Sequence, residues 1–232
     1  STSFICFDPM ADFLVEGGQV TCRFPDKHSE TTQLPANKPV TDLLQDFIDR
    51  LQVAPNDCPL AATGLYGYTT YDAVRYFENL QLKLDPAAPY AIPDMRYHLY
   101  RSVIAFNHFT NQLYLVEHLI GEEQSSYDKL LNILKNRTVP SFRFAPVNGE
   151  SSSLSNEDYK AMVGKGKEHC YRGDVFQIVL SRQFAQQFKG DEFNVYRALR
   201  HINPSPYLFF FDYGNYRLFG SSPESQLVVD KG

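Results

Sequence analysis

A single amide, Gln177, interrupts an otherwise apolar run at residues 175–180. The run predicts the start of a strand over residues 175–187, in which Gln177 shares a face with Val175 and Val179 because alternate residues point the same way. A buried amide without a partner costs about 1–3 kcal/mol. Gln177 is therefore expected either to bond neighbouring backbone groups or to line a pocket for a polar ligand.

The second feature with chemical consequences is the string Asn203-Pro204-Ser205-Pro206-Tyr207. Its two prolines fix the backbone angle φ and remove two backbone donors, which predicts a rigid turn between a helix and an aromatic strand. Such a turn either only ends the helix or holds a small amphipathic ligand through its free carbonyls and the ring of Tyr207.

The third feature is the string Gly220-Ser221-Ser222-Pro223-Glu224, at the predicted end of a strand. Glycine lets the backbone approach a ligand closely, and Ser221, Ser222 and Glu224 supply polar groups. On its own this pattern is equally typical of an ordinary loop at a strand end.

The composition favours a globular protein without a nucleic-acid or membrane partner. The chain has 232 residues, 43% hydrophobic and 14% aromatic, which is enough to form a substantial core. A net charge of −5 without a basic run argues against binding to phosphate backbones, and no stretch approaches the roughly 20 apolar residues that span a membrane. The four cysteines show no CxxC pair or zinc spacing, so we expect reduced thiols in a cytoplasmic protein.

Residues 1–139 are predicted to form a first region of antiparallel hairpins and helices. Gly17-Gly18 between two apolar runs is a hairpin-turn signal, and apolar stripes of helical period indicate the helices, the first of them capped by Thr41. The expected elements are hairpins over 4–24 and 97–119 and helices over 41–52 and 124–136.

Residues 140–154 are rich in Pro, Ser and Gly without a period and are predicted to be a linker. In residues 155–232, Ser155 is expected to cap a helix that ends at Gly173. A strand, a second helix stopped by Pro204 and a hairpin should follow. Because hairpins and helices replace a regular βαβ alternation, the predicted fold class is α+β, with antiparallel sheets and helices packed outside.

In this order and spacing, the strings at 173–182, 203–207 and 220–224 resemble the chorismate-utilising enzymes, most nearly anthranilate synthase component I. Residues 3–9 and 64–78 resemble segments of the N-terminal half of the same group, so the resemblance covers essentially the whole chain. It implies the α+β fold of that group in incomplete form. Residues 1–139 would be its N-terminal region, and residues 155–232 the beginning of its chorismate-binding domain.

The resemblance implies a lyase of tryptophan biosynthesis, a branch of aromatic amino acid biosynthesis. Members bind chorismate with Mg²⁺, add ammonia delivered by a glutamine amidotransferase subunit (component II), and release pyruvate to give anthranilate. Gln177 stands where related isochorismate-forming enzymes carry a lysine that activates water. Because a glutamine side chain does not titrate in the useful range, the resemblance favours ammonia as the nucleophile.

The resemblance also implies feedback inhibition by tryptophan. In component I, tryptophan binds between a Leu-Leu-Glu-Ser segment near the N-terminus and an Asn-Pro-Ser-Pro-Tyr-Met segment, which matches residues 203–208 here with leucine in place of methionine. The candidate tryptophan contacts are therefore Pro206, Tyr207 and Leu208, supported by Asn203 and Ser205.

By the same resemblance, most of the active site is expected outside residues 1–232. The Leu-Leu-Glu-Ser segment should precede Ser1, and the chorismate loop, the metal-binding glutamates, the catalytic acid and the substrate-binding Tyr and Arg should follow Gly232. We therefore expect no metal ligand and no complete catalytic set in the chain, and no chorismate turnover by these residues alone. Ser221, Ser222 and Glu224 would form a loop in the vicinity of the substrate.

Two alternatives share these features. Aminodeoxychorismate synthase component I, of the folate pathway, resembles the chain closely, although the sequence of residues 176–181 and the Asn-Pro-Ser-Pro-Tyr string favour anthranilate synthase. A non-catalytic amino-acid-binding regulatory module is the alternative from another class, and it would require a gene that ends near residue 232.

Overall fold

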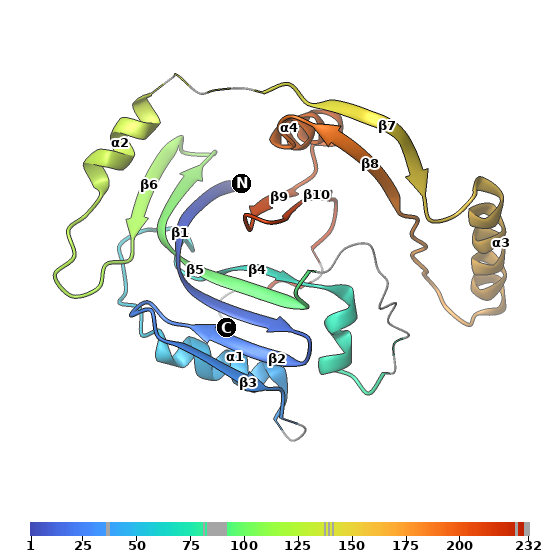
Figure 1. Ribbon diagram of the computed structural model, residues 1–232, viewed down its shortest axis with the longest axis horizontal. Coiled ribbons are helices and arrows are strands. Elements are labelled where there is room, and N and C mark those ends of the chain that lie inside the picture. Colours follow the sequence, from blue (N-terminus) through green and yellow to red (C-terminus); the bar gives the residue numbers. More distant parts are fainter. Residues whose placement is uncertain are drawn as a thin grey trace. The chain divides into compact units, whose positions relative to one another are not determined.

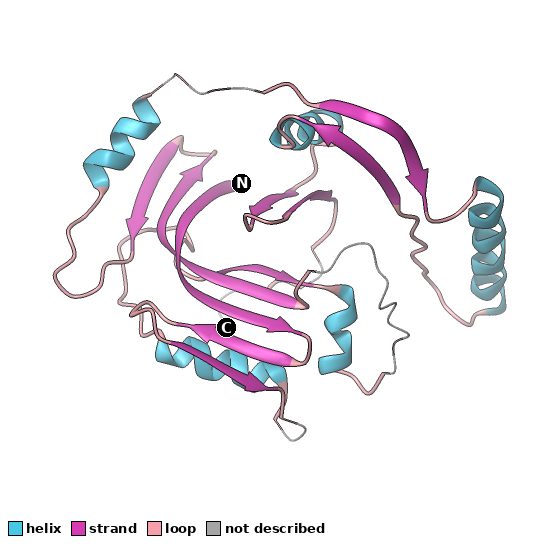
Figure 2. Ribbon diagram, viewed as in Figure 1, coloured by secondary structure: helices cyan, strands magenta, loops and turns pink. Residues whose placement is uncertain are grey.

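In the computed structural model, the chain folds as two compact units, each described here by itself. Unit 1 comprises Ser1–Arg137 together with Phe211–Arg217, and unit 2 comprises Thr138–Phe210 together with Leu218–Gly232. The structure describes all residues except 36, 37, 81, 83–91, 137, 139, 141, 226 and 230–232. Figure 1 labels the helices and strands, and Figure 2 separates them by type.

Unit 1 is built on an antiparallel sheet whose long strand β1 (Thr2–Glu16) turns back into β2 (Gln19–Arg23) and β3 (Ser29–Gln33). The turn between β1 and β2 is Gly17-Gly18, and both residues have positive φ, of 56° and 76°. Glycine adopts that conformation without steric cost, so the predicted hairpin over 4–24 is confirmed.

The centre of the sheet is β5 (Met95–Asn107), which pairs with β1 along one edge. Its other edge is shared by β4 (Leu65–Thr69) and β6 (Gln112–Glu117). The strand order is β3-β2-β1-β5-β4, with β6 also on β5. The predicted hairpin over 97–119 is confirmed, since Asn107 pairs with Gln112 at its turn.

One face of this sheet is apolar and is covered by α1 (Val40–Arg50) (Figure 1). Phe13 on β1 packs against Phe47 on α1, with ring centroids 5.6 Å apart. A 3₁₀ helix, η1 (Tyr71–Tyr76), adds Ala73 to the same core. The predicted cap Thr41 is wrong, because the helix starts one residue earlier after Pro39 and has no side-chain cap hydrogen bond.

The opposite face of the sheet is polar and aromatic near the middle of β1 and β5. Asp12 pairs in register with His98, and Arg96 lies two residues before His98, so all three side chains share this face. Residues 211–217, from far along the chain, belong to unit 1 and contact this face through Tyr213. A second small core, centred on Val103 and Val116, lies further along β5 and β6, and α2 (Tyr127–Lys135) follows.

Unit 2 contains α3 (Asn156–Arg172) beside an antiparallel strand pair (Figure 2). Both predicted ends of α3 are confirmed. The Asp158 N–H donates to the Ser155 hydroxyl at 3.0 Å, which is the N-cap hydrogen bond. Gly173 ends the helix with a left-handed φ of 79°.

The strand pair of unit 2 differs from the prediction. β7 (Ala145–Ser152) pairs with β8 (Phe184–Lys189). Residues 140–154 are therefore more than a linker, because residues 145–152 form an exposed strand. The strand predicted over 175–187 forms only from Phe184 onward, and residues 175–183 are irregular.

The last elements are α4 (Phe193–Ile202), β9 (Tyr207–Asp212) and β10 (Arg217–Ser222). α4 ends before Pro204 as predicted, and β9 pairs with β10 around Gly214, whose φ is 86°. Aromatic rings from α4 and both strands pack together within unit 2: Phe193, Tyr196, Phe210 and Phe219. The fold class is thus α+β with antiparallel sheets, as predicted.

No helix in the described part of the chain has both the length and the apolar character needed to cross a membrane.

Candidate functional site

Two of the three strings identified in the sequence meet at the base of the β9–β10 hairpin. The Ser221 hydroxyl donates to the backbone oxygen of Asn203 at 2.7 Å. It lies 2.6 Å from the Ser205 hydroxyl, which must then donate to it because a hydroxyl carries one proton. The Asn-Pro-Ser-Pro-Tyr turn and the Gly-Ser-Ser-Pro-Glu loop therefore form one connected group.

Gly220 packs closely against a neighbouring aromatic ring. A Cβ atom at position 220 would lie 2.7 Å from the ring of Phe209 on the neighbouring strand. Beyond it, the Ser222 hydroxyl donates to the Glu224 backbone oxygen at 2.8 Å, which turns the chain after β10. The carboxylate of Glu224 is exposed.

The predicted tryptophan contacts lie on the same hairpin. Tyr207 is 45% exposed, Leu208 is partly buried and Pro206 is exposed. An exposed proline, a half-exposed aromatic ring and an aliphatic side chain in succession offer a stiff apolar surface. That surface suits a small aromatic ligand, and its role stays a prediction.

Gln177 is not brought to this group by any described contact. It lies in the irregular stretch before β8 and is exposed, and its neighbour Phe176 is fully exposed at 101%. The expectation of a strand amide buried among apolar residues is therefore wrong. No hydrogen bond of its side chain occurs among the described residues, and its ligand-facing role stays a prediction.

A buried polar cluster on the second face of the unit 1 sheet was not predicted from the sequence. Asp12 Oδ1 lies 3.1 Å from His98 Nε2, and Asp12 Oδ2 lies 3.4 Å from an Arg96 nitrogen. Burial alone would raise the pKa of the Asp12 carboxyl, but hydrogen bonding and charge from His98, with charge from Arg96, lower it overall. The sequence signal that could have predicted this cluster is the presence of polar residues at alternate positions of otherwise apolar strands.

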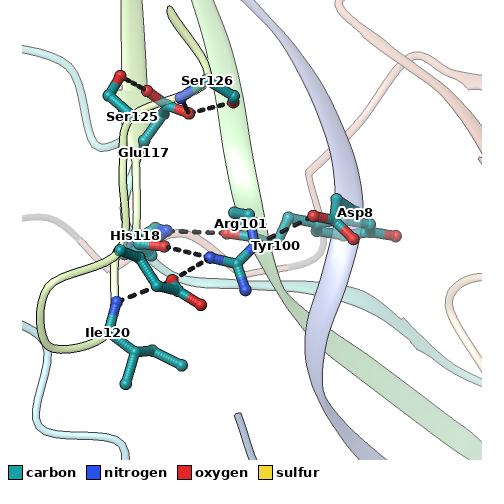
Figure 3. Close-up of polar contacts among 9 residues, drawn as sticks. Asp8, Tyr100, Arg101, Glu117, His118, Ile120, Ser125 and Ser126 are labelled. Atoms are coloured by element: carbon teal, nitrogen blue, oxygen red, sulfur yellow. Dashed lines mark hydrogen bonds and ion pairs between the residues drawn. The ribbon is translucent and has the colours of Figure 1, made fainter.

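A second group of missed polar residues fixes the loop after β6 (Figure 3). Arg101 binds two carboxylates, that of Asp8 at 3.0 Å and that of Glu123. The Glu117 carboxylate accepts hydrogen bonds from the hydroxyls of Ser125 and Ser126 and from the Ser126 N–H. Burial would raise the pKa of Glu117, but these hydrogen bonds lower it overall. These contacts hold the loop after β6 to the strands of unit 1.

A cavity of about 700 Å³ lies in unit 1, and none of the predicted site residues lines it. It is bounded by the end of α1, the turn after β2 and the end of β6, and its lining includes Met10, Phe24, Arg50 and Leu99. Arg50 already donates two hydrogen bonds to Glu30, at 2.8 and 3.0 Å, and lies over the ring of Phe24. The lining is nevertheless mixed, because Asp26, His28, Glu117 and His118 also border the cavity. Among the described residues, the buried His118 Nε2 has no hydrogen-bond partner.

The implied Mg²⁺ finds no ligand set in the described part of the chain, where no group of three His, Cys, Asp or Glu side chains could hold a metal ion. Glu224 alone, exposed at the end of β10, does not make an octahedral oxygen site.

Comparisons with known proteins agree on one family. The family pattern of the chorismate binding enzymes matches residues 2–232. A crystal structure of anthranilate synthase component I from Streptococcus pneumoniae TIGR4 superimposes with a TM-score of 0.72 at 25% identity, covering 100% of this chain and 52% of that one.

Curated relatives extend well beyond the chain. Anthranilate synthase component 1 of Acinetobacter calcoaceticus is 32% identical over 208 residues, which cover 82% of this chain and 41% of the relative. The component 1 of Acetivibrio thermocellus is 30% identical, covering 73% and 37%. An anthranilate synthase alpha subunit 1 of Oryza sativa subsp. indica, chloroplastic, is 33% identical, covering 72% and 33%. The chain thus spans about two fifths or less of these relatives, and with residues 2–232 matched it belongs to the chorismate binding enzyme family.

Proposed function

We propose that the protein containing this chain is an anthranilate synthase component I. It would convert chorismate and ammonia to anthranilate, pyruvate and water. Ammonia forms the new C–N bond as the 4-hydroxyl leaves, and elimination of pyruvate then makes the ring aromatic. The observation that carries the proposal is the connection of the two diagnostic strings through Ser221, Ser205 and Asn203, in a chain whose relatives bear that name.

The residues of this chain would act by positioning. Gln177 is uncharged and cannot take a proton from water at neutral pH, which supports ammonia, supplied by a glutamine amidotransferase subunit, as the nucleophile. Ser221 and Ser222 would shape the backbone next to the substrate. Mg²⁺ would be held by residues outside the chain and would supply charge stabilisation to the substrate carboxylate.

We further infer that tryptophan inhibits the enzyme by binding against Pro206, Tyr207 and Leu208. The half-exposed ring of Tyr207 supports this, because an aromatic ligand would gain an offset or edge-on ring contact there. Residues 1–232 alone should not form a complete substrate site and should not convert chorismate.

The test is to incubate chorismate, Mg²⁺ and excess ammonia with the whole protein and, separately, with a verified 232-residue chain, and to identify products by mass. Anthranilate from the whole protein only is expected. Aminodeoxychorismate would reassign the protein to the folate pathway, and anthranilate from the 232-residue chain would refute its proposed inactivity.

For tryptophan, the informative variants are Tyr207→Ala and Tyr171→Ala in the whole protein. Tyr171 lies on α3 and is 84% exposed, so it is a matched exposed tyrosine. Inhibition should weaken by about fivefold in Tyr207→Ala, which corresponds to loss of roughly 1 kcal/mol of ring contact, and should be unchanged in Tyr171→Ala. Equal inhibition in both variants would remove the assignment of the site.

A further inference from the structure

The cavity of unit 1 borders both of its apolar cores. Phe24 and Leu99 belong to the core that α1 covers, Met10 packs against that core, and Val116 belongs to the second core. All four side chains line the cavity, whose volume of about 700 Å³ falls within the roughly 300–1,000 Å³ of small-molecule sites. Its inner wall therefore consists of core side chains and suits the apolar body of a ligand.

The outer edge of the cavity is apolar as well. Val53, Leu119 and Ile120 line the cavity and are 39%, 43% and 41% exposed. They belong to the segment after α1 and to the loop after β6. Because these side chains reach both the solvent and the cavity, an apolar molecule can enter along them.

The charged groups that border the cavity already have partners. The Arg50 guanidinium donates to both carboxylate oxygens of Glu30, and His28 Nε2 lies 2.9 Å from the same carboxylate. Asp26 Oδ1 accepts from the His28 N–H, and the Glu117 carboxylate accepts three hydrogen bonds from the loop after β6. The charge of a ligand buried against the apolar wall would therefore go unmatched, which favours a neutral ligand.

His118 differs from these groups because one of its ring nitrogens is unsatisfied. Nδ1 lies 2.8 Å from the backbone oxygen of Tyr100 (Figure 3). A carbonyl oxygen only accepts, so Nδ1 carries the proton, and Nε2 of the neutral ring has a lone pair that can accept a hydrogen bond. Nε2 is buried and has no partner among the described residues. The ring is thus held in place through one nitrogen, while the other is left for a donor.

A buried acceptor without a partner lowers stability and requires an explanation. A buried water would need about two to four polar partners. The amide of Asn56, which also lines the cavity, already donates to Thr63 and accepts from the Cys58 N–H. A ligand that carries one donor on an apolar body satisfies Nε2 without further polar partners.

We propose that the cavity binds a neutral amphipathic small molecule, whose apolar body packs against Met10, Phe24, Leu99 and Val116 and whose single hydroxyl or N–H donates to His118 Nε2. The proposal does not rest on the proposed activity, because none of the predicted site residues lines the cavity. The ligand would also stabilise unit 1 by mass action, since the unfolded chain has no such cavity.

The test uses β-naphthol, a neutral fused-ring molecule with one hydroxyl donor, and its methyl ether, which has no donor. Each is titrated into the whole protein near neutral pH by isothermal titration calorimetry. β-Naphthol should bind about fivefold more tightly than the ether, which is the effect of one net hydrogen bond of about 1 kcal/mol. Absence of binding by both probes, or equal affinities, overturns the proposal.

The first variant, His118→Asn, removes the Nε2 acceptor but keeps a side-chain N–H that can donate to the Tyr100 oxygen. It should bind β-naphthol about fivefold more weakly and the ether unchanged, because only the naphthol loses a hydrogen bond. The control is His108→Asn, at an exposed histidine that bonds Ser3 at 2.7 Å and does not line the cavity. It should leave both affinities unchanged. An undiminished preference for the naphthol in His118→Asn overturns the proposal.

The second variant tests the location of the site without altering a buried residue. Ala54 lines the cavity and is exposed, so Ala54→Phe places a ring at the cavity edge without disturbing the core. Both probes should bind more weakly to this variant. Ala161→Phe, at an exposed alanine of α3, should change neither affinity. Unaltered binding in Ala54→Phe would place the probes elsewhere and overturn the proposed site.

Discussion

Unit 1 and unit 2 both contain large apolar side chains, but unit 1 buries many more of them than unit 2 does. Unit 1 contains both apolar cores, with Phe13, Val15 and Phe47 almost completely buried. Among the described residues of unit 2, Gly166 is the only buried one, and large side chains such as Phe176 and Ile202 are exposed.

The difference is not one of local pattern, because α1 and α4 are both amphipathic helices of ten or eleven residues. α1 buries Val40 and Phe47 against a six-stranded sheet, whereas α4 buries no residue. An amphipathic pattern indicates that a helix needs an apolar partner to cover its apolar face. Only the tertiary structure shows whether the described chain provides one.

The largest effect is expected in the core of unit 1. Phe13→Ala should lower the free energy of unfolding of unit 1 by about 3–5 kcal/mol, because it removes a ring with no exposed area and leaves a cavity beside Phe47. Phe176→Ala, in unit 2, should change stability by less than about 0.5 kcal/mol. Urea unfolding followed by circular dichroism measures both, and similar losses would show that unit 2 is packed after all.

The cysteines should report the same contrast chemically. Burial raises the pKa of the Cys6 thiol in unit 1 from 9.0 to about 12, whereas Cys170 on α3 of unit 2 is exposed. Because only thiolate reacts, iodoacetamide at pH 8 should label Cys6 about a thousandfold more slowly than a thiol of ordinary pKa. Labelling of each cysteine is followed by mass spectrometry, with Cys170→Ser as the control that removes the fast site.

The same pKa has a consequence for stability, and its sign follows from linkage. The native state of Cys6 favours the protonated thiol more than the unfolded state does. Its contribution to the stability of unit 1 is therefore complete below about pH 9 and is lost as the pH rises toward about 12. Comparable labelling of Cys6 and Cys170 at pH 8 would contradict both expectations.

Two glycines of unit 1 should differ in how well they tolerate a side chain. A Cβ at Gly67 would lie 1.9 Å from the backbone oxygen of Arg96, whereas one at Gly64 would meet nothing within 4 Å. Gly67→Ala should therefore cost about 1–3 kcal/mol or more by forcing β4 away from β5, and Gly64→Ala should be nearly neutral. Thermal unfolding measures the stability of both variants, and equal melting temperatures would contradict the close pairing of β4 with β5.

The smallest effect is expected at the N-cap of α3. Ser155→Ala should cost about 1 kcal/mol of helix stability, because it removes the hydrogen bond to the Asp158 N–H. Ser155→Asp should restore most of it, since aspartate is an equally good cap. Amide exchange of residues 156–160 measures the effect, and an unaffected helix would mean that α3 is held by contacts beyond its cap.

The sequence by itself determined the elements whose cause is local. Gly17-Gly18 and Gly214 set tight turns, and Ser155 and Gly173 set the two ends of α3, since these residue types favour those backbone conformations wherever they occur. It also identified the family, because the order of the three strings is a property of the chain alone. The α+β class followed from segments with the hydrophobic period of a strand and segments with that of a helix.

Tertiary structure decided the rest. The apolar run at 175–180 has a strand pattern, yet residues 175–183 form no strand. A strand needs a neighbouring strand with which to share a ladder of backbone hydrogen bonds. Residues 145–152 have a linker composition, yet they form β7 because β8 supplies those hydrogen bonds. The His98 cluster could not be read from the sequence either. It requires β1, β5 and the hairpin tip at 211–217 to meet, and only the three-dimensional fold brings together residues separated by more than a hundred positions.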